Sequence, residues 1–417
     1  MKVAWLLNDL QLSGGVGVVV EHARQLAHHH DFECVLVLAR EQEDPDWQYR
    51  GLTDLRVETL PSARRESFDI AICTWWETAF SLFELDAARY AYFIQSLEDR
   101  FYYIEQPERI GAAMTLDLPV DFITEATWIA RTIEELRPES RVFLVRNGID
   151  KDSFPLPERL EARRGDRPLH VLVEGHSQVW FKGVEQAAYA AGTMRQPHHL
   201  TIVTADREFL SPDVPADEIV GPVPRAEMSE LYARSDVVLK MSSVEGMFGP
   251  PLEGFHRGAT CVVTPVTGHD EYVVHGWNGL VTEWDDPRGT AGALDLLAAD
   301  RRLLHFLRTN AVETARAWPS WDQSGQFMAA ALNRIRRLPP AQASGRRLAA
   351  DIRAAMDVNT KLLIQRNQMS AELEPLWTLQ AHPGVRRLRK LRHTRIGRVL
   401  TWPARRLVRL LLRSRSG

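Results

Sequence analysis

The stretch Ser242-Ser243-Val244-Glu245-Gly246-Met247-Phe248-Gly249-Pro250-Pro251-Leu252-Glu253 sets two carboxylates eight residues apart, with glycines and a double proline between them. The apolar run Asp236–Leu239 before it predicts a short buried strand. Pro250-Pro251 can open a helix, because the first helical residues need no amide hydrogen. Gly258 then closes that helix before a second apolar strand, Cys261–Val263.

This pattern places Glu245 in the loop after a strand and Glu253 in the first turn of the next helix. In a parallel α/β sheet, that edge is where ligands bind. Backbone amides around Phe248 and Gly249 would face the same edge and suit an anion such as a diphosphate. A solvated loop with a capping glutamate is the alternative interpretation.

Strands alternate with helices along most of the chain, which predicts doubly wound, mostly parallel α/β sheets. One alternation starts at Val3–Leu7 and a second at His170–Glu174, with a turn at Asn147–Asp150 between them. Ser320 fits the N-cap of a helix that starts at Trp321. The other expected strands are Cys34–Leu38, Val57–Leu60, Asp69–Cys73, Tyr90–Ile94, 122–123 and Val142–Val145, and expected helices run to about His29 and over Thr127–Leu136 and Val184–Thr193.

The segment from Glu245 to Glu253 resembles the E-x7-E signature of the family-4 retaining glycosyltransferases, which use nucleotide-sugars and have the GT-B fold. The resemblance continues through Gly258, Thr264-Pro265, Gly268, Glu271 and residues 275–280, and it covers about residues 1–338. It implies two Rossmann-like domains that face a cleft. The expected division is 1–147 for the acceptor, 148–338 for the nucleotide-sugar, with 318–338 as a helix crossing back to the first domain, and 339–417 as a helical, basic extension.

The resemblance also assigns roles to side chains. Glu245 would contact hydroxyls of the donor sugar and Glu253 the ribose, since a carboxylate accepts hydrogen bonds from paired hydroxyls. Lys182, before Gly183 and a helix, would neutralise the departing diphosphate; a merely exposed lysine is the alternative. The family pairs this lysine with an upstream arginine, whose place His176 takes here, so we expect His176 to offer one donor where arginine offers five.

Further candidates lie in the first half of the chain. Gly14-Gly15 follows the first strand and precedes a helix, so its backbone can approach a donor phosphate, although such turns are also often purely structural. Gln95 falls at a strand end facing the expected cleft, where the family often places a histidine, and the resemblance makes it a catalytic candidate together with Glu245 and Lys182. Trp75 and Trp76 would stack on acceptor sugars or else pack between the domains. The surrounding segments 73–78 and 90–102 resemble a subgroup that includes rhamnosyltransferases of bacterial surface polysaccharides.

The expected activity is retaining transfer of a hexosyl or deoxyhexosyl group from a dTDP-, UDP- or GDP-sugar to a saccharide or lipid-linked saccharide in surface glycan assembly. We expect no metal or other cofactor. Asp44-Pro45-Asp46 spells a D-x-D metal motif, but it lies in a polar loop with no strand before it. A nucleotide-sugar epimerase or hydrolase of the same fold remains an alternative, as does a degenerate nucleotide-sugar-binding scaffold.

The composition of the chain predicts where in the cell the protein resides. Cys34, Cys73 and Cys261 fall in predicted strands without metal-ligand spacing, which favours buried thiols in a reducing compartment, and we expect a cytoplasmic protein. The formal net charge of −4 combines +12 between Arg386 and Arg415 with −16 in the rest. These cations alternate with apolar residues, so we expect 386–415 to bind the anionic inner face of a membrane. Docking on the acidic body of the protein is an alternative; nucleic acid would attract the same charges, but we expect no nucleic-acid partner.

Overall fold

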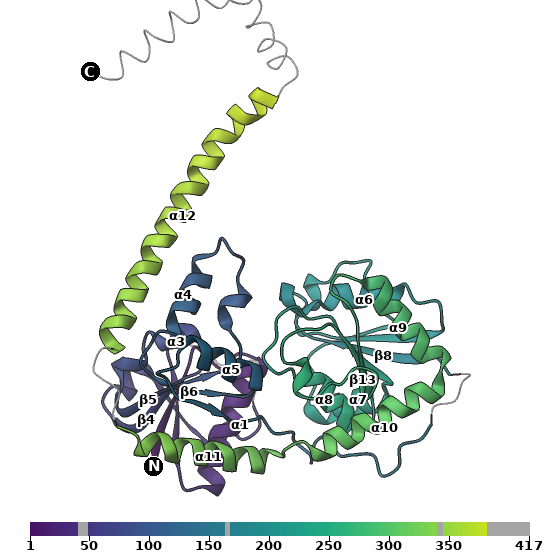
Figure 1. The fold of residues 1–417 in the computed structure, drawn as a ribbon, viewed down its shortest axis with the longest axis horizontal. Helices are drawn as coiled ribbons and strands as arrows, with labels where there is room; N and C mark the ends of the chain where they lie inside the picture. The colour runs from purple at the N-terminus through teal and green to yellow at the C-terminus, as the bar shows by residue number, and fades with distance from the viewer. Residues whose placement is uncertain (41–48, 163–166, 340–344, 382–417) are drawn as a thin grey trace, which may run out of the picture. The chain divides into compact units, whose positions relative to one another are not determined.

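The computed structural model describes residues 1–40, 49–162, 167–339 and 345–381 (Figure 1). The chain divides into two compact units, Met1–Arg353 and Ala354–Gly417, and the first unit contains two β-sheets. Both sheets are entirely parallel and alternate with helices, so the predicted doubly wound α/β class is confirmed.

The first sheet has the strand order β3-β2-β1-β4-β5-β6-β7. Its strands are β1 (Lys2–Leu7), β2 (Glu33–Leu38), β3 (Arg56–Thr59), β4 (Ser67–Cys73), β5 (Asp86–Ile94), β6 (Asp121–Thr124) and β7 (Val142–Leu144). The direction of the order reverses between β1 and β4. In open parallel sheets, ligands bind beyond the carboxyl ends of the strands at such a reversal.

The second sheet repeats this plan with the order β10-β9-β8-β11-β12-β13. Its strands are β8 (Leu169–Glu174), β9 (His198–Val203), β10 (Glu218–Val220), β11 (Val237–Lys240), β12 (Thr260–Val263) and β13 (Gly279–Val281). Here the reversal lies between β8 and β11, so the carboxyl ends of these two strands are the expected ligand edge. Cys34, Cys73 and Cys261 are buried free thiols, as predicted.

Helices connect these strands and follow the last of them. They are α1 (Gly14–His29), α2 (Leu60–Ala63), α3 (Trp76–Ala79), α4 (Pro107–Thr115), α5 (Thr127–Leu136), α6 (Val184–Gly192), α7 (Arg225–Arg234), α8 (Pro250–His256), α9 (Pro287–Ala299), α10 (Arg301–Ala317), α11 (Trp321–Arg337) and α12 (Gly345–Ala381). As predicted, α8 opens on Pro250 and ends before Gly258, which takes φ +84° while Ala259 N donates to Gly254 O at 2.8 Å.

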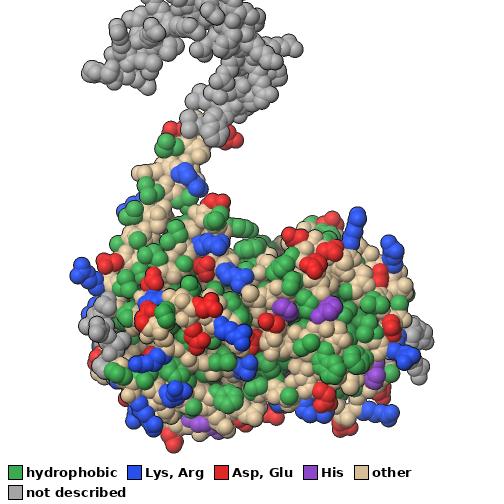
Figure 2. Space-filling view, in the orientation of Figure 1, with side chains coloured by type: hydrophobic (Ala, Val, Ile, Leu, Met, Phe, Trp, Pro, Cys, Tyr) green, Lys and Arg blue, Asp and Glu red, His purple; other side chains and the backbone are tan. Residues whose placement is uncertain are grey.

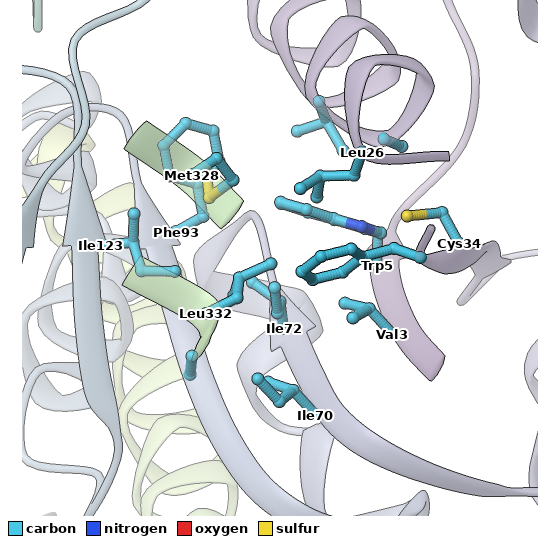
Figure 3. Close-up of a cluster of buried hydrophobic side chains, with 14 of the residues drawn as sticks. Val3, Trp5, Leu26, Cys34, Ile70, Ile72, Phe93, Ile123, Met328 and Leu332 are labelled. Atoms are coloured by element: carbon cyan, nitrogen blue, oxygen red, sulfur yellow. The ribbon is translucent and has the colours of Figure 1, made fainter. Parts of the chain in front are cut away.

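Helix α11 packs on the first sheet. Ser320 caps it as predicted, in a capping box with Gln323. Met328 and Leu332 of α11 belong to the same buried cluster as Trp5 of β1 (Figure 3). The chain therefore passes from the first sheet to the second after β7 and returns with α11. The domain boundaries at 147/148 and 338/339 stay a prediction.

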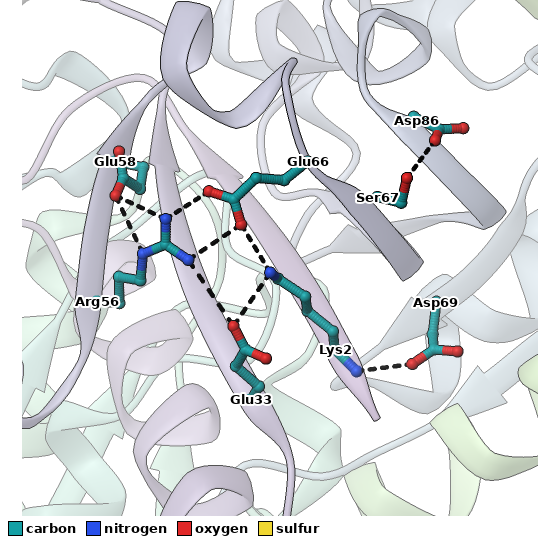
Figure 4. A network of polar contacts seen from close by, with 8 residues as sticks. All are labelled: Lys2, Glu33, Arg56, Glu58, Glu66, Ser67, Asp69 and Asp86. Atoms are coloured by element: carbon teal, nitrogen blue, oxygen red, sulfur yellow. Dashed lines mark hydrogen bonds and ion pairs between the residues drawn. The ribbon is translucent and has the colours of Figure 1, made fainter.

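The amino-terminal edge of the first sheet carries a polar network (Figure 4). Lys2 Nζ lies 2.6 Å from a Glu66 oxygen and 3.1 Å from a Glu33 oxygen, and Arg56 pairs with Glu58 at 2.9 Å. These residues come from the starts of neighbouring strands, opposite the ligand edge. We therefore assign the network to stability.

Helix α12 begins in the first unit. Ala349 and Ile352 are 2% and 1% exposed and join a core cluster of the first sheet. None of the described helices combines the length and apolar character needed to cross a membrane. Acidic and basic side chains are interspersed over the face of the protein that Figure 2 shows. The basic segment 386–415 lies outside the described residues.

Candidate functional site

The loops at the carboxyl ends of the two sheets meet at residues 241–249, which connect β11 to α8 and are called here the Glu245 loop. Trp128 of α5 donates its indole N–H to Gly246 O at 2.8 Å. The Met247 amide donates to Glu125 Oε1, after β6, at 3.1 Å. The loop that carries the first glutamate of the motif is thus held by both sheets.

Glu245 lies in a buried cluster of charges. Its Oε2 is 2.9 Å from Lys182 Nζ, and its Oε1 is 3.8 Å from Lys240 Nζ. The side chains of Glu245 and Lys240 are 7% and 4% exposed, whereas that of Lys182 is 27% exposed. Burial alone would raise the pKa of Glu245, but the two ammonium groups outweigh it and hold the pKa below its usual value. Glu245 is therefore an ionised carboxylate at neutral pH.

The Lys182-Gly183 pair is placed by backbone geometry. Gly183 has φ +62°, and a Cβ there would lie 2.3 Å from Met241 O. Ser243 N donates to Phe181 O at 2.8 Å, so the backbone before α6 runs directly against the Glu245 loop. Only glycine permits this approach, and it brings Lys182 onto Glu245.

Lys240 is a site residue that the sequence analysis missed. It ends β11, one residue beyond the strand predicted to stop at Leu239. Its ammonium donates to Glu174 O at 3.2 Å and lies 3.5 Å from Glu174 Oε2. The sequence did contain a signal for it, because Lys240 directly continues the apolar run Val237–Leu239. Lysine is rarely buried without a partner, so a lysine at the end of a buried strand indicates a nearby carboxylate.

Glu253 lies in the first turn of α8, as predicted. Burial raises its pKa to about 7; nearby Arg225 works against this rise and Glu174 adds to it. Phe248 is buried, and its carbonyl accepts a hydrogen bond from Tyr272 Oη at 2.6 Å. Gly249 is the N-cap of α8. Anion binding by the amides of Phe248 and Gly249 stays a prediction.

His176 lies in the loop after β8. Asp206 anchors this loop, accepting from Ser177 N at 2.8 Å and from Gln178 N at 2.9 Å. The His176 side chain is 39% exposed, with Nδ1 3.9 Å from Asp206 Oδ2. A Cβ on the preceding Gly175 would lie 3.9 Å from Lys240 Nζ, so this loop passes beside the charge cluster.

On the first sheet's side, Gly14 and Gly15 form the first residues of α1, which Ser13 caps. Gln95, after β5, donates from Nε2 to Gly15 O at 3.2 Å. A Cβ on Gly246 would lie only 1.7 Å from Gln95 O. The structure therefore brings Gly15, Gln95 and the Glu245 loop together, and their roles with a ligand stay predictions.

The two tryptophans differ. Trp76 is 2% exposed, and its indole N–H donates to Tyr102 Oη at 2.9 Å. Because a ring enclosed in this way has no free face, the expected stacking of Trp76 on an acceptor sugar is wrong; it is a packing residue. Trp75 is partly exposed and stacks on Phe101 (5.7 Å between centroids, 10°), which stacks on Phe181 (4.8 Å, 16°). This stack joins the two halves of the site beside Lys182, and an acceptor role for Trp75 stays a prediction.

A buried hydrogen-bond chain behind the site was not foreseen. Glu125, which accepts from the Met247 amide, also accepts from Asn147 Nδ2. Asn147 Oδ1 in turn lies 3.2 Å from His22 Nε2 of α1. Burial raises the pKa of Glu125 to about 8 and lowers that of His22 to about 4, so both side chains are mainly neutral at pH 7. The chain ties the Glu245 loop to the segment where the sheets are connected.

Glu271 joins the two halves in a second way. Its carboxylate accepts from Thr127 N at 2.5 Å and from Thr127 Oγ1 at 2.9 Å. Thr127 is the first residue of α5, whose N-cap Ala126 has no side-chain acceptor. Glu271, 144 residues away, supplies the missing cap and places a negative charge at the positive end of the helix.

Within the described ranges, no group of three or more His, Cys, Asp or Glu side chains is arranged to hold a metal ion. Asp44-Pro45-Asp46 lies outside the described residues, so the structure does not bear on that motif.

Comparison with known proteins gives the fold. Residues 169–300, which contain Lys182, Glu245 and Glu253, match the family model described as glycosyl transferases group 1. Sucrose-phosphate synthase from Thermosynechococcus elongatus superposes with a TM-score of 0.66 at 14% identity, over 80% of this chain and 98% of that one. Anabaena HepE, in complex with UDP and glucose, superposes with a TM-score of 0.65 at 14% identity, over 80% of this chain and 100% of that one. TarM of S. aureus, in a complex containing UDP, superposes with a TM-score of 0.61 at 9% identity, over 80% of this chain and 99% of that one.

No curated protein sequence matches the chain. The expected GT-B fold, two Rossmann-like sheets with a helical C-terminal region, is confirmed.

Proposed function

We propose that this protein is a retaining glycosyltransferase that moves a sugar from a nucleoside diphosphate donor to a saccharide or lipid-linked saccharide. One observation carries the proposal: the Lys182–Glu245 pair, at 2.9 Å, lies at the ligand edge of the second sheet, where it meets the first. An ammonium suits a diphosphate and a carboxylate suits sugar hydroxyls. The group 1 match over these residues and the UDP in the HepE complexes support the same assignment.

In the proposed reaction, the bond between the donor's anomeric carbon and its phosphate oxygen breaks. The acceptor oxygen bonds to that carbon from the same face, and its proton passes to the departing phosphate. Lys182 would stabilise the charge that grows on the diphosphate, with His176 and the amides near Phe248 and Gly249 as further donors. Glu245 would orient the sugar and Glu253 the ribose. This scheme requires no metal or other cofactor.

The finer assignments rest on the sequence resemblance. We propose membership of the family-4 enzymes, with the rhamnosyltransferase-like segments 73–78 and 90–102 favouring a deoxyhexose donor and surface glycan assembly. Gln95 and Trp75, on the first sheet's side of the site, would then face the acceptor. The base of the donor is left open between dTDP, UDP and GDP.

The direct test is release of nucleoside diphosphate from a panel of dTDP-, UDP- and GDP-sugars, with and without a mixture of saccharide and lipid-linked acceptors. We expect release from one donor that depends on acceptor, with retained anomeric configuration in the product. Release without acceptor would instead indicate a hydrolase or epimerase. Nucleotide binding without any turnover would indicate a binding scaffold.

Donor binding should depend on pH through Glu253. Because the pKa of this partly buried carboxyl is raised to about 7, it is mostly protonated at pH 6 and mostly ionised at pH 8. The ionised form accepts stronger hydrogen bonds from the two ribose hydroxyls than the protonated form, so affinity falls as the pH drops through 7. We expect the nucleoside diphosphate to bind roughly tenfold more weakly at pH 6 than at pH 8, measured by calorimetry. Glu253→Gln controls for titration of the ligand itself; equal pH dependence in both proteins would contradict the role of Glu253.

We also propose that residues 386–415 attach the enzyme to an anionic membrane surface. Twelve cations without an acidic residue, each contributing about 1 kcal/mol near such a surface, suffice for binding at moderate salt. Truncation after Pro383 should abolish co-sedimentation with vesicles containing phosphatidylglycerol and preserve activity on short soluble acceptors. Neutral phosphatidylcholine vesicles are the control. If full-length protein does not bind the anionic vesicles at low salt, the proposal is wrong. Binding to nucleic acid and not to the vesicles would indicate a nucleic-acid partner for this segment.

A further inference from the structure

Lys240 has no part in the reaction scheme above, although it is the more deeply buried of the two lysines beside Glu245. Its side chain is 4% exposed and lies between two carboxylates, 3.5 Å from Glu174 Oε2 and 3.8 Å from Glu245 Oε1. A charged lysine this deep is costly unless it is paired. Because so little of it is exposed, Lys240 is not placed to receive a ligand phosphate itself.

The proposed roles of Lys182 and Glu245 conflict in the ligand-free protein. Their 2.9 Å ion pair occupies the ammonium that the diphosphate needs and the carboxylate that the sugar needs. Lys182 is 27% exposed and can turn toward a ligand that carries more negative charge than one carboxylate. Donor binding therefore means that Glu245 loses its closest cation.

A carboxylate at 7% exposure that loses its counter-ion would take up a proton, because burial disfavours the charged form. A protonated Glu245 is a poorer acceptor for sugar hydroxyls. Glu245 Oε1 is buried, and among the described residues Lys240 is the cation that lies beside it, at 3.8 Å, with the Ser242 hydroxyl as a further polar neighbour of the carboxylate. Lys240 also remains in place when Lys182 moves, since Glu174 holds it from β8.

We infer that Lys240 is a positioning residue that keeps Glu245 ionised and oriented while the donor diphosphate draws Lys182 away. The inference rests on the proposed function for the event that moves Lys182, but the charge relationship exists without any ligand. The second cation of this site thus comes from β11, beside Gly175, and serves the carboxylate and not the phosphate.

The groups that face Glu245 come from several elements. Besides Lys182 and Lys240, the Ser242 hydroxyl, Glu125 and Tyr272 interact with Glu245. The charge of Glu245 adds to burial in raising the pKa of Glu125 and of Tyr272, so both groups are mainly neutral at pH 7. Glu174 faces Lys240. Removing Lys182 should therefore leave Lys240 as the cation that opposes the effect of burial on Glu245.

The test uses ligand-free protein, with Lys182→Met standing in for the displaced lysine. Protein labelled with ¹³Cδ-glutamate is titrated by NMR, and the Glu245 signal is identified by its loss in Glu245→Gln. We expect Glu245 to stay ionised at pH 7 in Lys182→Met. In the double variant Lys182→Met/Lys240→Met, the pH at the midpoint of the Glu245 titration should rise by roughly two units or more. Lys240→Arg in the same background should restore the low midpoint, and exposed Lys361→Met is the matched control. Equal midpoints in Lys182→Met and the double variant would overturn the inference.

Activity adds a second readout that separates this inference from the proposed function. In Lys240→Met alone, the acid limb of the kcat/KM profile should move to higher pH, with activity recovering as the pH rises. A merely structural loss would lower activity equally at all pH values and would also count against Lys240. If the wild type turns over no donor, the proposed function fails while the NMR result still decides the charge relationship. Should the Met variants not fold, Lys240→Gln keeps a hydrogen bond to Glu174 O and removes the same charge.

Discussion

Glu245→Gln should lower kcat for donor turnover by roughly 10² to 10³, the effect typical of removing one group that stabilises charge in a transition state. Glutamine has the shape of glutamate, but its amide cannot pair with sugar hydroxyls as a carboxylate does, and it cannot balance Lys182 and Lys240. The measurement is nucleoside diphosphate release at saturating donor and acceptor. The ion pair at 2.9 Å makes this the side chain on which the proposed function depends most directly.

Folding must be separated from catalysis in that experiment. Removing one partner of a buried charge cluster costs about 3–5 kcal/mol of stability, so thermal unfolding of the variant has to be followed in parallel. Glu283→Gln is a matched control, because Glu283 is an exposed carboxyl beyond β13 on the same sheet edge, and it should retain full activity. A folded Glu245→Gln protein with unchanged turnover would remove Glu245 from the mechanism.

Much of the fold follows from local patterns in the sequence. The predicted helix Thr127–Leu136 has the observed bounds of α5, and Ser320 caps α11 as its spacing to Gln323 requires. The positions of Glu245 after a strand and of Glu253 in the first turn of a helix could also be predicted from the sequence, because prolines and glycines determine where α8 begins and ends. These features depend on residues close together in the chain.

The features that escaped prediction depend on contacts between distant segments. Trp75 and Trp76 are adjacent and chemically identical, yet one stacks across the site and the other is enclosed, because only the fold decides which ring meets Phe101. Lys240 gains its partner Glu174 through pairing of β11 with β8. Glu271 caps a helix that starts 144 residues earlier. Spacing in the sequence carries no signal for such pairs.

The same long-range contacts show that the two sheets of the first unit are connected through the Glu245 loop. Gly246 lies at the point of closest approach: its carbonyl accepts from Trp128, and a Cβ on Gly268 would lie 1.8 Å from that carbonyl oxygen. The next residue, Met247, binds Glu125 through its amide. A loop held from both sheets in this way transmits any change in their packing to Glu245.

Gly246→Ala should therefore disable the enzyme without removing a functional group. The added Cβ would lie 1.7 Å from Gln95 O and 3.1 Å from Glu125 Oε1, and the first of these is a backbone atom that no side-chain rotation can move. The loop or the first sheet must shift by more than an ångström, and displacement of that size in a catalytic group costs about 10² in rate. We expect kcat/KM to fall by roughly that factor, with the Trp128 fluorescence changed because its hydrogen bond to Gly246 O is lost.

Gly292→Ala gives the comparison that isolates this effect. Gly292 lies inside α9, where a Cβ would meet nothing within 4 Å, and alanine favours a helix interior over glycine by about 1 kcal/mol. That variant should keep full activity and gain stability, whereas Gly246→Ala should lose activity while each sheet stays folded. If Gly246→Ala were as active as Gly292→Ala, contact between Gln95 and the Glu245 loop would not belong to the active conformation. The two sheets would then have to separate before reaction, and the roles proposed for Gln95 and Trp75 at the acceptor would fall with that contact.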